Sequence, residues 1–404
     1  MLNRTVNHGA SESKLPAWAP SGGGEGFATR IVAAVPDSAD SVVCTRKGAA
    51  RHIDVAGLEK RITTGDRVAL AQAITLVESR TEQHRVLADE LIDRLTPRSQ
   101  PSIRIGISGV PGAGKSTFID SLGLNLVRLG RRLAVLSVDP SSPVSGGSIL
   151  ADKTRMDRLA REAGVFIRPS PSGGLLGGVA RRTREVIGLC EAAGYDTIIV
   201  ETVGVGQSEV VVRSMVDCFV LLTIAGTGDE LQGMKKGILE LAHLVVVNKA
   251  DGENKVRAES AALELERALR YLDAKGEDEK PKVRTCSALT GEGVAEIWLA
   301  VEACIDRARR RGDFDRIRRS QNVSWMNDLL LQLLADRCES NKQLRSMRAA
   351  IESEVAEGRV SARRAARMVV DEMITGWRDE CRDEAHNRDA LFGKKRGVGV
   401  ADLP

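Results

Sequence analysis

Eight consecutive residues have the types and the spacing needed to hold the phosphates of a nucleotide. The segment Gly109-Val110-Pro111-Gly112-Ala113-Gly114-Lys115-Ser116 matches the pattern G-x-x-x-x-G-K-[ST]. Its glycines let backbone N–H groups curl around phosphate oxygens, Lys115 supplies a positive charge to the β and γ groups, and Ser116 offers a hydroxyl to Mg²⁺. We therefore expect a nucleoside triphosphate site with Lys115 as a catalytic group. Its lining would be Gly109, Pro111, Gly112, Ala113, Gly114, Lys115, Ser116 and Thr117.

The residues on both sides of this segment predict the strand and the helix that a phosphate loop requires. The apolar run 103–107 is typical of a buried strand, and residues 116–128 suit a helix that closes at Gly130. A chance glycine turn would lack this strand-loop-helix context, so we interpret the segment as a true phosphate loop.

The segment Asn248-Lys249-Ala250-Asp251 indicates which base is bound. The Asp251 carboxylate can accept two hydrogen bonds from the ring N–H and the exocyclic amine of guanine, while the Lys249 stem covers the base. Adenine does not present that pair of donors, and a buried acceptor without a partner penalises the wrong base. GTP and GDP are therefore the expected ligands. Ser287, Ala288 and Leu289 follow a later apolar run, where a backbone N–H could meet the guanine carbonyl.

Carboxylates near the ends of other apolar runs are candidates for a magnesium site. Asp139 follows the run 133–138 and Glu201 follows the run 197–200, which places both at the ligand end of a parallel sheet and makes both candidate catalytic groups. Asp152 closes the Gly-, Ser- and Pro-rich segment that Asp139 opens, and is either a magnesium ligand or a solvated loop carboxylate or helix cap. The expected magnesium neighbourhood is Ser116, Asp139, Asp152 and Glu201.

A glycine close after Glu201 predicts a conformational switch. The Gly204 N–H can bond the γ-phosphate only while that phosphate is present, so hydrolysis would release the loop around it. Ras-like enzymes carry a glutamine directly after this glycine to orient the attacking water, whereas this chain carries Val205, and we assign the nearby Gln207 to polar packing. Slow hydrolysis by the chain alone is the expected consequence, which implies a partner protein that accelerates it.

Alternation of short apolar runs with helix-length segments predicts an α/β fold, a P-loop NTPase with helices flanking a mostly parallel sheet. The expected strands are 103–107, 133–138, 165–167, 197–200, 219–224, 244–247 and 283–286. We divide the chain into a flexible tail (1–56), N-terminal helices (57–100), a P-loop GTPase domain (101–311) and a C-terminal helical arm (312–404) with a frayed end.

The C-terminal hundred residues carry no catalytic motif. Three stretches at helical spacing between Trp325 and Trp377 predict a small helical core. The arginines within 307–319 alternate with Asp306, Asp313 and Asp315, which favours a solvated helix and linker over a nucleic-acid surface.

Composition fits a cytoplasmic enzyme without a nucleic-acid or membrane partner. The chain has 404 residues, of which 42% are hydrophobic, and a net charge of only +4. Its seven cysteines include no C-x-x-C pair, which favours a reducing compartment. Mitochondrial targeting by the first residues is an alternative, but their acidic side chains nearly balance the basic ones, unlike those of transit peptides.

Six segments in order resemble the methylmalonyl-CoA mutase-associated GTPases, called MeaB in bacteria and MMAA in animals and formerly ArgK. They are 109–117, 138–142, 152–156, 201–209, 226–238 and 248–251, and the resemblance extends over roughly residues 58–377. It implies a homodimeric GTPase chaperone, related to the metal-insertion GTPases, that gates adenosylcobalamin loading into methylmalonyl-CoA mutase and protects or reactivates that enzyme. The long tail before Gly57 departs from the usual family start.

The same resemblance implies roles for individual residues. Lys115 would bind phosphate, Ser116, Asp139, Asp152 and Glu201 would surround magnesium, and Asn248, Lys249 and Asp251 would read guanine. The segment 226–236 resembles an additional switch through which the mutase stimulates hydrolysis, with Gln232, Lys235 and Lys236 as its functional residues. From the residues alone, this segment suits a flexible loop entering a capped helix with a solvated face. The C-terminal arm would embrace a second subunit.

Two other classes of function share a phosphate loop. A metallochaperone GTPase needs clustered His or Cys ligands, but the histidines of this chain are scattered along the sequence. A kinase linked to amino-acid transport would need to tolerate ATP, against which Asp251 argues. A binding module without turnover is a third alternative, and a related cobalamin-dependent mutase is an alternative client.

Overall fold

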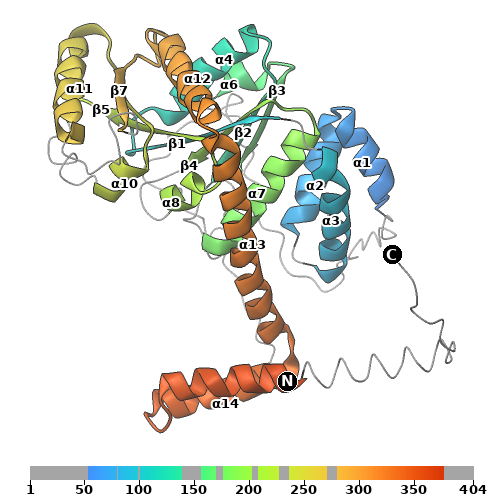
Figure 1. Cartoon of the computed structure of the whole chain (residues 1–404). Helices are drawn as coiled ribbons and strands as arrows, with labels where there is room; N and C mark the ends of the chain where they lie inside the picture. The colour runs from blue at the N-terminus through green and yellow to red at the C-terminus, as the bar shows by residue number, and fades with distance from the viewer. Residues whose placement is uncertain are drawn as a thin grey trace, which may run out of the picture. The chain divides into compact units, whose positions relative to one another are not determined.

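The computed structural model describes residues 53–79, 81–98, 101–138, 156–169, 176–202, 208–226, 236–270 and 280–376, and the structural statements below concern these ranges. Seven parallel strands form one sheet in the order β3-β2-β4-β1-β5-β6-β7 (Figure 1). The strands are β1 (Ile103–Gly109), β2 (Leu133–Val138), β3 (Val165–Pro169), β4 (Thr197–Thr202), β5 (Cys218–Ile224), β6 (Leu244–Asn248) and β7 (Lys282–Thr285). The predicted α/β fold is confirmed.

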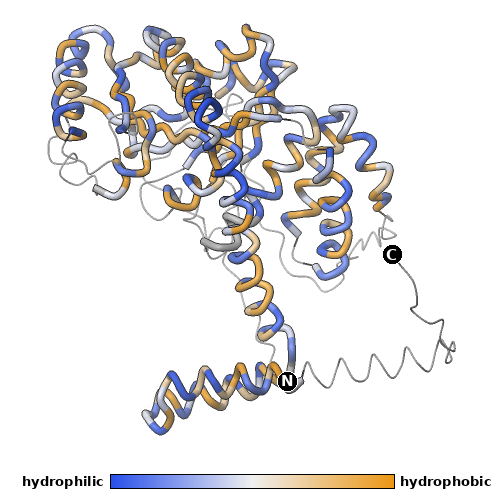
Figure 2. Tube along the Cα trace, in the orientation of Figure 1, coloured by the Kyte–Doolittle hydropathy of each residue, from blue (hydrophilic) through white to orange (hydrophobic). Residues whose placement is uncertain are grey.

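Helices cover both faces of the sheet, which explains why its strands are continuous apolar runs. All residues of β2 and β4 are buried, as expected of a parallel sheet, whereas the edge strand β7 alternates buried and exposed side chains. One face packs on α4 (Lys115–Arg128), α6 (Asp157–Ala160) and α12 (Val294–Arg310). The other packs on α7 (Leu176–Ala192), α8 (Ser208–Arg213), α10 (Lys236–Leu241) and α11 (Lys255–Arg270). Figure 2 shows the hydrophobic colouring of the central strands.

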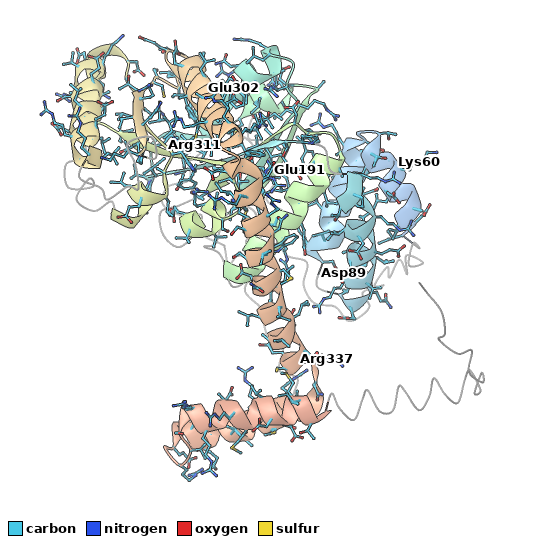
Figure 3. All side chains as sticks on the ribbon, in the orientation of Figure 1. Lys60, Asp89, Glu191, Glu302, Arg311 and Arg337 are labelled. Atoms are coloured by element: carbon cyan, nitrogen blue, oxygen red, sulfur yellow. The ribbon has the colours of Figure 1, made fainter. Side chains whose placement is uncertain are left out.

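Three N-terminal helices join the core on the α7 side. They are α1 (Val55–Thr63), α2 (Arg67–Glu78) and α3 (Glu82–Leu95), followed by the 3-10 turn η1 (Thr96–Arg98). Aspartates start the first two helices: Asp54 accepts a hydrogen bond from the Gly57 N–H at 3.0 Å, and Asp66 accepts one from the Val68 N–H at 2.8 Å. Lys60 and Asp89 project from these helices, whereas Glu191 of α7 lies inside (Figure 3).

A buried ion pair attaches α13 (Asp313–Ser340) to the base of the sheet. Arg318 Nε donates to Asp217 Oδ1 at 2.8 Å and Arg318 Nη2 donates to Asp217 Oδ2 at 2.6 Å. The Arg318 side chain is 20% exposed and that of Asp217 only 3%. Asp217 Oδ2 also accepts from the Arg104 N–H of β1. The interpretation of residues 307–319 as a solvated helix and linker is therefore wrong for Arg318, because its side chain is largely buried against Asp217. The sequence pattern does not reveal this pair, because the two residues lie far apart along the chain.

We expect replacement of Arg318 by alanine to cost about 3 kcal/mol of unfolding free energy, because it leaves the Asp217 carboxylate buried without its cation. Urea denaturation of purified protein measures this loss. The matched control is Arg316→Ala, which removes the exposed pair with Asp313 on the same helix and should cost at most about 1 kcal/mol. Equal losses in the two variants would contradict the assignment.

The C-terminal helices leave apolar side chains exposed. After α13 come α14 (Lys342–Ala356) and a helix over 362–376, and a mainly apolar cavity of about 560 Å³ lies among the three, lined by residues such as Cys338, Ile351 and Val369. No residue of α13 is fully buried, and Leu330 and Leu331 are 53% and 68% exposed. Leu344, Ala365 and Met373 of these helices are buried, so part of the apolar surface predicted for a helical core is covered, while the apolar side chains of α13 stay exposed.

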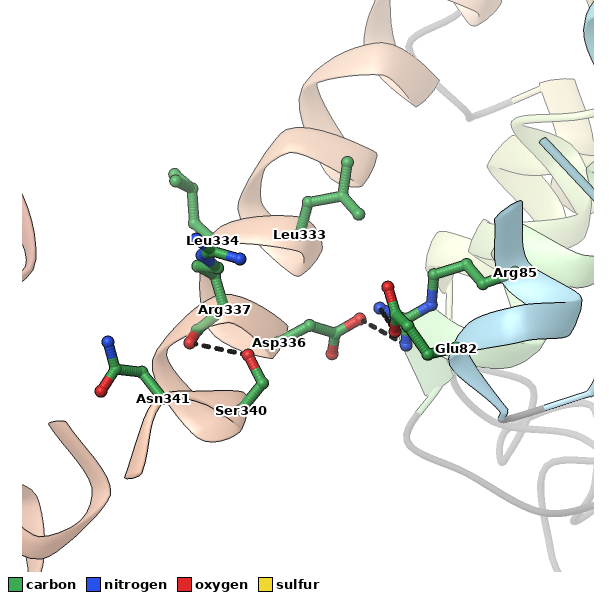
Figure 4. A pocket seen from close by; sticks show the side chains of 8 residues that line it. All are labelled: Glu82, Arg85, Leu333, Leu334, Asp336, Arg337, Ser340 and Asn341. Atoms are coloured by element: carbon green, nitrogen blue, oxygen red, sulfur yellow. Dashed lines mark hydrogen bonds and ion pairs between the residues drawn. The ribbon is translucent and has the colours of Figure 1, made fainter. Parts of the chain in front are cut away.

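A shallow pocket lies where α3 approaches the end of α13. It has a volume of about 760 Å³, and Arg85 of α3 and Asp336 of α13 point toward one another across it, with 3.9 Å between Nη2 and Oδ2 (Figure 4). Both side chains are about one-third exposed, so this ion pair contributes little to stability.

His243, which precedes β6, is held as a neutral imidazole. Its Nδ1 accepts a hydrogen bond from the Phe219 N–H at 2.9 Å, and its Nε2 lies 3.2 Å from Arg213 Nη2. Burial, followed by the charge of Arg213, lowers the pKa of His243 from its usual 6.5 to about 3.

A pH dependence of stability follows from this imidazole. Between pH 6.5 and 3 the His243 imidazole is protonated in the unfolded chain but neutral in the folded chain. Its contribution to the free energy of unfolding is therefore fully present above pH 6.5 and is lost as the pH falls. We expect His243 to account for about 2 kcal/mol of lost unfolding free energy between pH 7.5 and pH 5. Denaturation of wild type and His243→Asn across this range measures it, and an identical pH dependence in both would contradict the prediction.

Among the helices in the described part of the chain, none combines the length and the apolar character needed to cross a bilayer.

Candidate nucleotide-binding site

The phosphate loop joins the end of β1 to the start of α4. Gly112 and Gly114 have φ angles of 77° and 85°, in the left-handed region that glycine adopts without strain. A side chain at Gly109 would overlap the backbone carbonyl of Leu222 on β5, so this position also needs glycine. Lys115 is half-buried, and its Nζ donates to the Gly109 carbonyl at 2.9 Å, so the amine lies within the loop. Pro111 and Gly112 are exposed on the same loop, Ala113 is buried, and Thr117 is exposed in the first turn of α4.

Asn248, the last residue of β6, connects the phosphate loop to the predicted base-reading loop. Its Nδ2 donates to the Ala113 carbonyl at 2.7 Å, and its Oδ1 accepts from the Ala288 N–H at 2.9 Å. The side chain is 1% exposed, and a side chain at Gly114 would approach Asn248 Nδ2 within 2.8 Å. The two loops are therefore held together by one buried amide, a role the sequence analysis did not assign.

The predicted guanine-reading residues come together at the adjacent strand ends. Ser287 Oγ donates to Asp251 Oδ2 at 2.5 Å, and because Ser287 is fully buried, it fixes the orientation of the carboxylate. Lys249 is exposed and has a φ of 61°, an uncommon conformation for a residue with a side chain. Leu289 is 78% exposed beside them. The carboxylate of Asp251, the stem of Lys249 and the apolar side chain of Leu289 are the groups from which a guanine site is predicted here.

Two of the four predicted magnesium ligands are in contact. Ser116 Oγ donates to Glu201 Oε1 at 3.3 Å, and Glu201 is 4% exposed. A hydroxyl and a carboxylate are donors suited to Mg²⁺, which takes few protein ligands and keeps several waters. The residues present therefore fit this ion. Five predicted residues, Asp139, Asp152, Gly204, Gln232 and Lys235, lie outside the described residues, as does the side chain of Lys236.

Three buried polar residues behind the phosphate loop have no role that their sequence pattern predicts. Thr202 Oγ1 donates to Ser108 Oγ at 2.8 Å, and Ser108 Oγ donates to Glu209 Oε1 at 3.3 Å. The only sequence signal was a pair of hydroxyl residues at the ends of two apolar runs, which is compatible with many other arrangements.

A phosphate loop after the first strand of a parallel sheet, with an N-K-x-D segment at the end of β6, defines a P-loop GTPase. Residues 70–343 match the family described as methylmalonyl Co-A mutase-associated GTPase MeaB. The chain belongs to this family.

Relatives from bacteria and animals agree with this membership. The chain is 51% identical to the probable GTPase Rv1496 of Mycobacterium tuberculosis over 80% of this chain and 97% of that protein. It is 44% identical to the mouse methylmalonic aciduria type A homolog, mitochondrial, over 76% of this chain and 77% of that protein. A crystal structure of an LAO/AO transport system kinase is 38% identical, with a TM-score of 0.63, and covers 79% of this chain and 97% of its own.

Proposed function

We propose that this chain is a slow GTPase whose hydrolysis of GTP gates the loading of adenosylcobalamin into methylmalonyl-CoA mutase and protects or reactivates that enzyme. The observation that carries the proposal is the set of hydrogen bonds that holds Asn248, Asp251 and Ser287, the residues predicted to read guanine, at adjacent strand ends in a chain of the mutase-associated family. The family name links its members to the mutase, and Rv1496 is named a probable GTPase.

The residues of the site can be given separate tasks. Asp251, oriented by Ser287, would select guanine, and the Lys115 ammonium would stabilise the charge that develops on the β and γ phosphates. Ser116 and Glu201, with Asp139 and Asp152, would hold Mg²⁺, which bridges phosphate oxygens and neutralises their charge when bound. Val205 cannot orient the attacking water as a glutamine does, so the remaining help would come from the partner, acting through Gln232 and Lys235.

The proposal is tested by steady-state hydrolysis of GTP and ATP with and without a cobalamin-dependent methylmalonyl-CoA mutase. Slow GTP turnover that the mutase raises at least tenfold is the expected result. Turnover that the mutase leaves unchanged would overturn the partner, and equal use of ATP would overturn the guanine selectivity.

We also propose that the chain works as a homodimer in the cytoplasm. Exposed apolar residues of α13 spaced four and three apart, Met326, Leu330 and Leu333, lie on one side of the helix and form a face that a second copy can bury. Sedimentation equilibrium of the full chain at micromolar concentration should give twice the mass of one chain, and a monomer would contradict this proposal.

A further inference from the structure

Three buried polar side chains form a hydrogen-bonded chain directly behind the phosphate loop. Thr202 donates to Ser108 at 2.8 Å, and Ser108 donates in turn to the Glu209 carboxylate at 3.3 Å. All three residues are fully buried. Both hydroxyl groups donate toward the Glu209 carboxylate, so this series of hydrogen bonds has one direction.

The strand register explains why these residues are separate from the predicted magnesium site. Ile107 of β1 lies opposite Glu201 of β4, and neighbouring residues along a strand face opposite sides of the sheet. Glu201 therefore faces α4, where it meets Ser116, while Thr202 faces α8, where it meets Ser108 and Glu209. The pair Ser116–Glu201 and the group Thr202–Ser108–Glu209 therefore lie on opposite faces of the same sheet.

The sequence positions of the three residues connect them to the reaction. Ser108 immediately precedes Gly109 of the phosphate loop, Thr202 immediately follows Glu201, and Glu209 lies in the first turn of α8. The hydrogen bonds thus attach the end of β4 and the start of α8 to the strand that carries the phosphate loop. Burying a carboxylate costs more free energy than burying an apolar side chain of similar size. The position of Glu209 therefore favours a role in aligning the site over a role in stabilising the fold.

We propose that Thr202, Ser108 and Glu209 are positioning residues for GTP hydrolysis. They fix the positions of Glu201 and of the start of α8 relative to the phosphate loop. They do not contact the nucleotide themselves. The rate of hydrolysis depends on this alignment, whereas GDP affinity, which comes from the phosphate loop and the base-reading residues, does not. This inference rests on the proposed GTPase function.

The test compares kcat, the KM for GTP and the Kd for GDP in single variants of the full chain. Thr202→Val keeps the shape of the side chain and removes its donor, and Ser108→Ala breaks both bonds. We expect each to lower kcat about tenfold or more while the GDP Kd changes by less than about threefold. Thr202→Ser retains a hydroxyl and should restore kcat to within about twofold of wild type.

Thr223→Val is the matched control. Thr223 is a buried threonine of β5, the strand that pairs with β1 on the side away from β4. Its hydroxyl has no hydrogen-bond partner among the described residues, so its loss should leave kcat unchanged. An unchanged kcat in Thr202→Val, or equal losses in Thr202→Val and Thr223→Val, would overturn the positioning role. A wild-type chain that never hydrolyses GTP, with or without the mutase, would instead overturn the proposed function.

Discussion

Replacement of Asp251 by asparagine is expected to turn a guanine-nucleotide site into a xanthine-nucleotide site. The Ser287 hydroxyl, which now donates to Asp251 Oδ2 at 2.5 Å, can donate equally to the asparagine carbonyl. The new amide N–H₂ then faces the position of the guanine exocyclic amine. Two donors face one another there, whereas xanthine presents a carbonyl that accepts the hydrogen bond.

The expected effect is large because a buried polar group loses its partner. We expect the Kd for GDP to rise about a thousandfold or more, and the Kd for the xanthine diphosphate to fall by a similar factor. Isothermal titration calorimetry with both nucleotides measures the exchange. Glu253→Gln is the matched control, since this exposed carboxylate lies two residues further on and outside the predicted contacts. Loss of GDP binding without a gain for the xanthine nucleotide would show that the variant damages the loop.

Replacement of Lys115 by alanine is expected to lower the rate of GTP hydrolysis about a hundredfold or more. The ammonium group is the cation that the phosphate loop itself supplies, and its removal leaves charge on the phosphates uncompensated in the transition state. In the structure Lys115 Nζ donates to the Gly109 and Val110 carbonyls at 2.9 and 3.4 Å. These bonds place the amine within the loop, so little reorganisation is needed on binding.

Single-turnover hydrolysis at saturating GTP separates this loss from weaker binding. The control is Lys255→Ala, because this lysine is 50% exposed and pairs with the exposed Glu292 at 2.7 Å, so its removal should leave hydrolysis unchanged. A rate for Lys115→Ala within about threefold of wild type would contradict the assigned role. Thermal unfolding of each variant should accompany these measurements, to exclude loss of folded protein as the cause.

The elements around the phosphate loop were predictable because their signals are local. The pattern of residues 109–116 lies in one continuous segment, and β1 and α4 begin and end close to the limits that the apolar run and Gly130 indicate. Each buried parallel strand reads as a short apolar run, because both of its faces contact helices. The resemblance to the family was predictable for the same reason, since it depends on segments in order along the chain.

The contacts that hold the site together were not predictable, because they join residues far apart in the sequence. Asn248 and Ala113 are 135 residues apart, and Ser108 and Thr202 are 94 apart. Both pairs depend on the strand order β2-β4-β1-β5-β6, which the alternation of strands and helices does not specify. Arg318 illustrates the same point. The local sequence pattern of an arginine among aspartates is the same whether the arginine faces water or a buried carboxylate.

Local patterns along the sequence were therefore sufficient to predict the class of the protein: the phosphate loop, the guanine-reading motif, the α/β fold and the family. The strand order and register decided that Asn248 joins the two nucleotide loops, that Ser287 orients Asp251, and that Glu201 meets Ser116 while Thr202 meets Ser108. The physical reason is that local propensity and periodicity are properties of neighbouring residues. A hydrogen bond between distant residues exists only after strand order and register bring their atoms within 3 Å or so of one another.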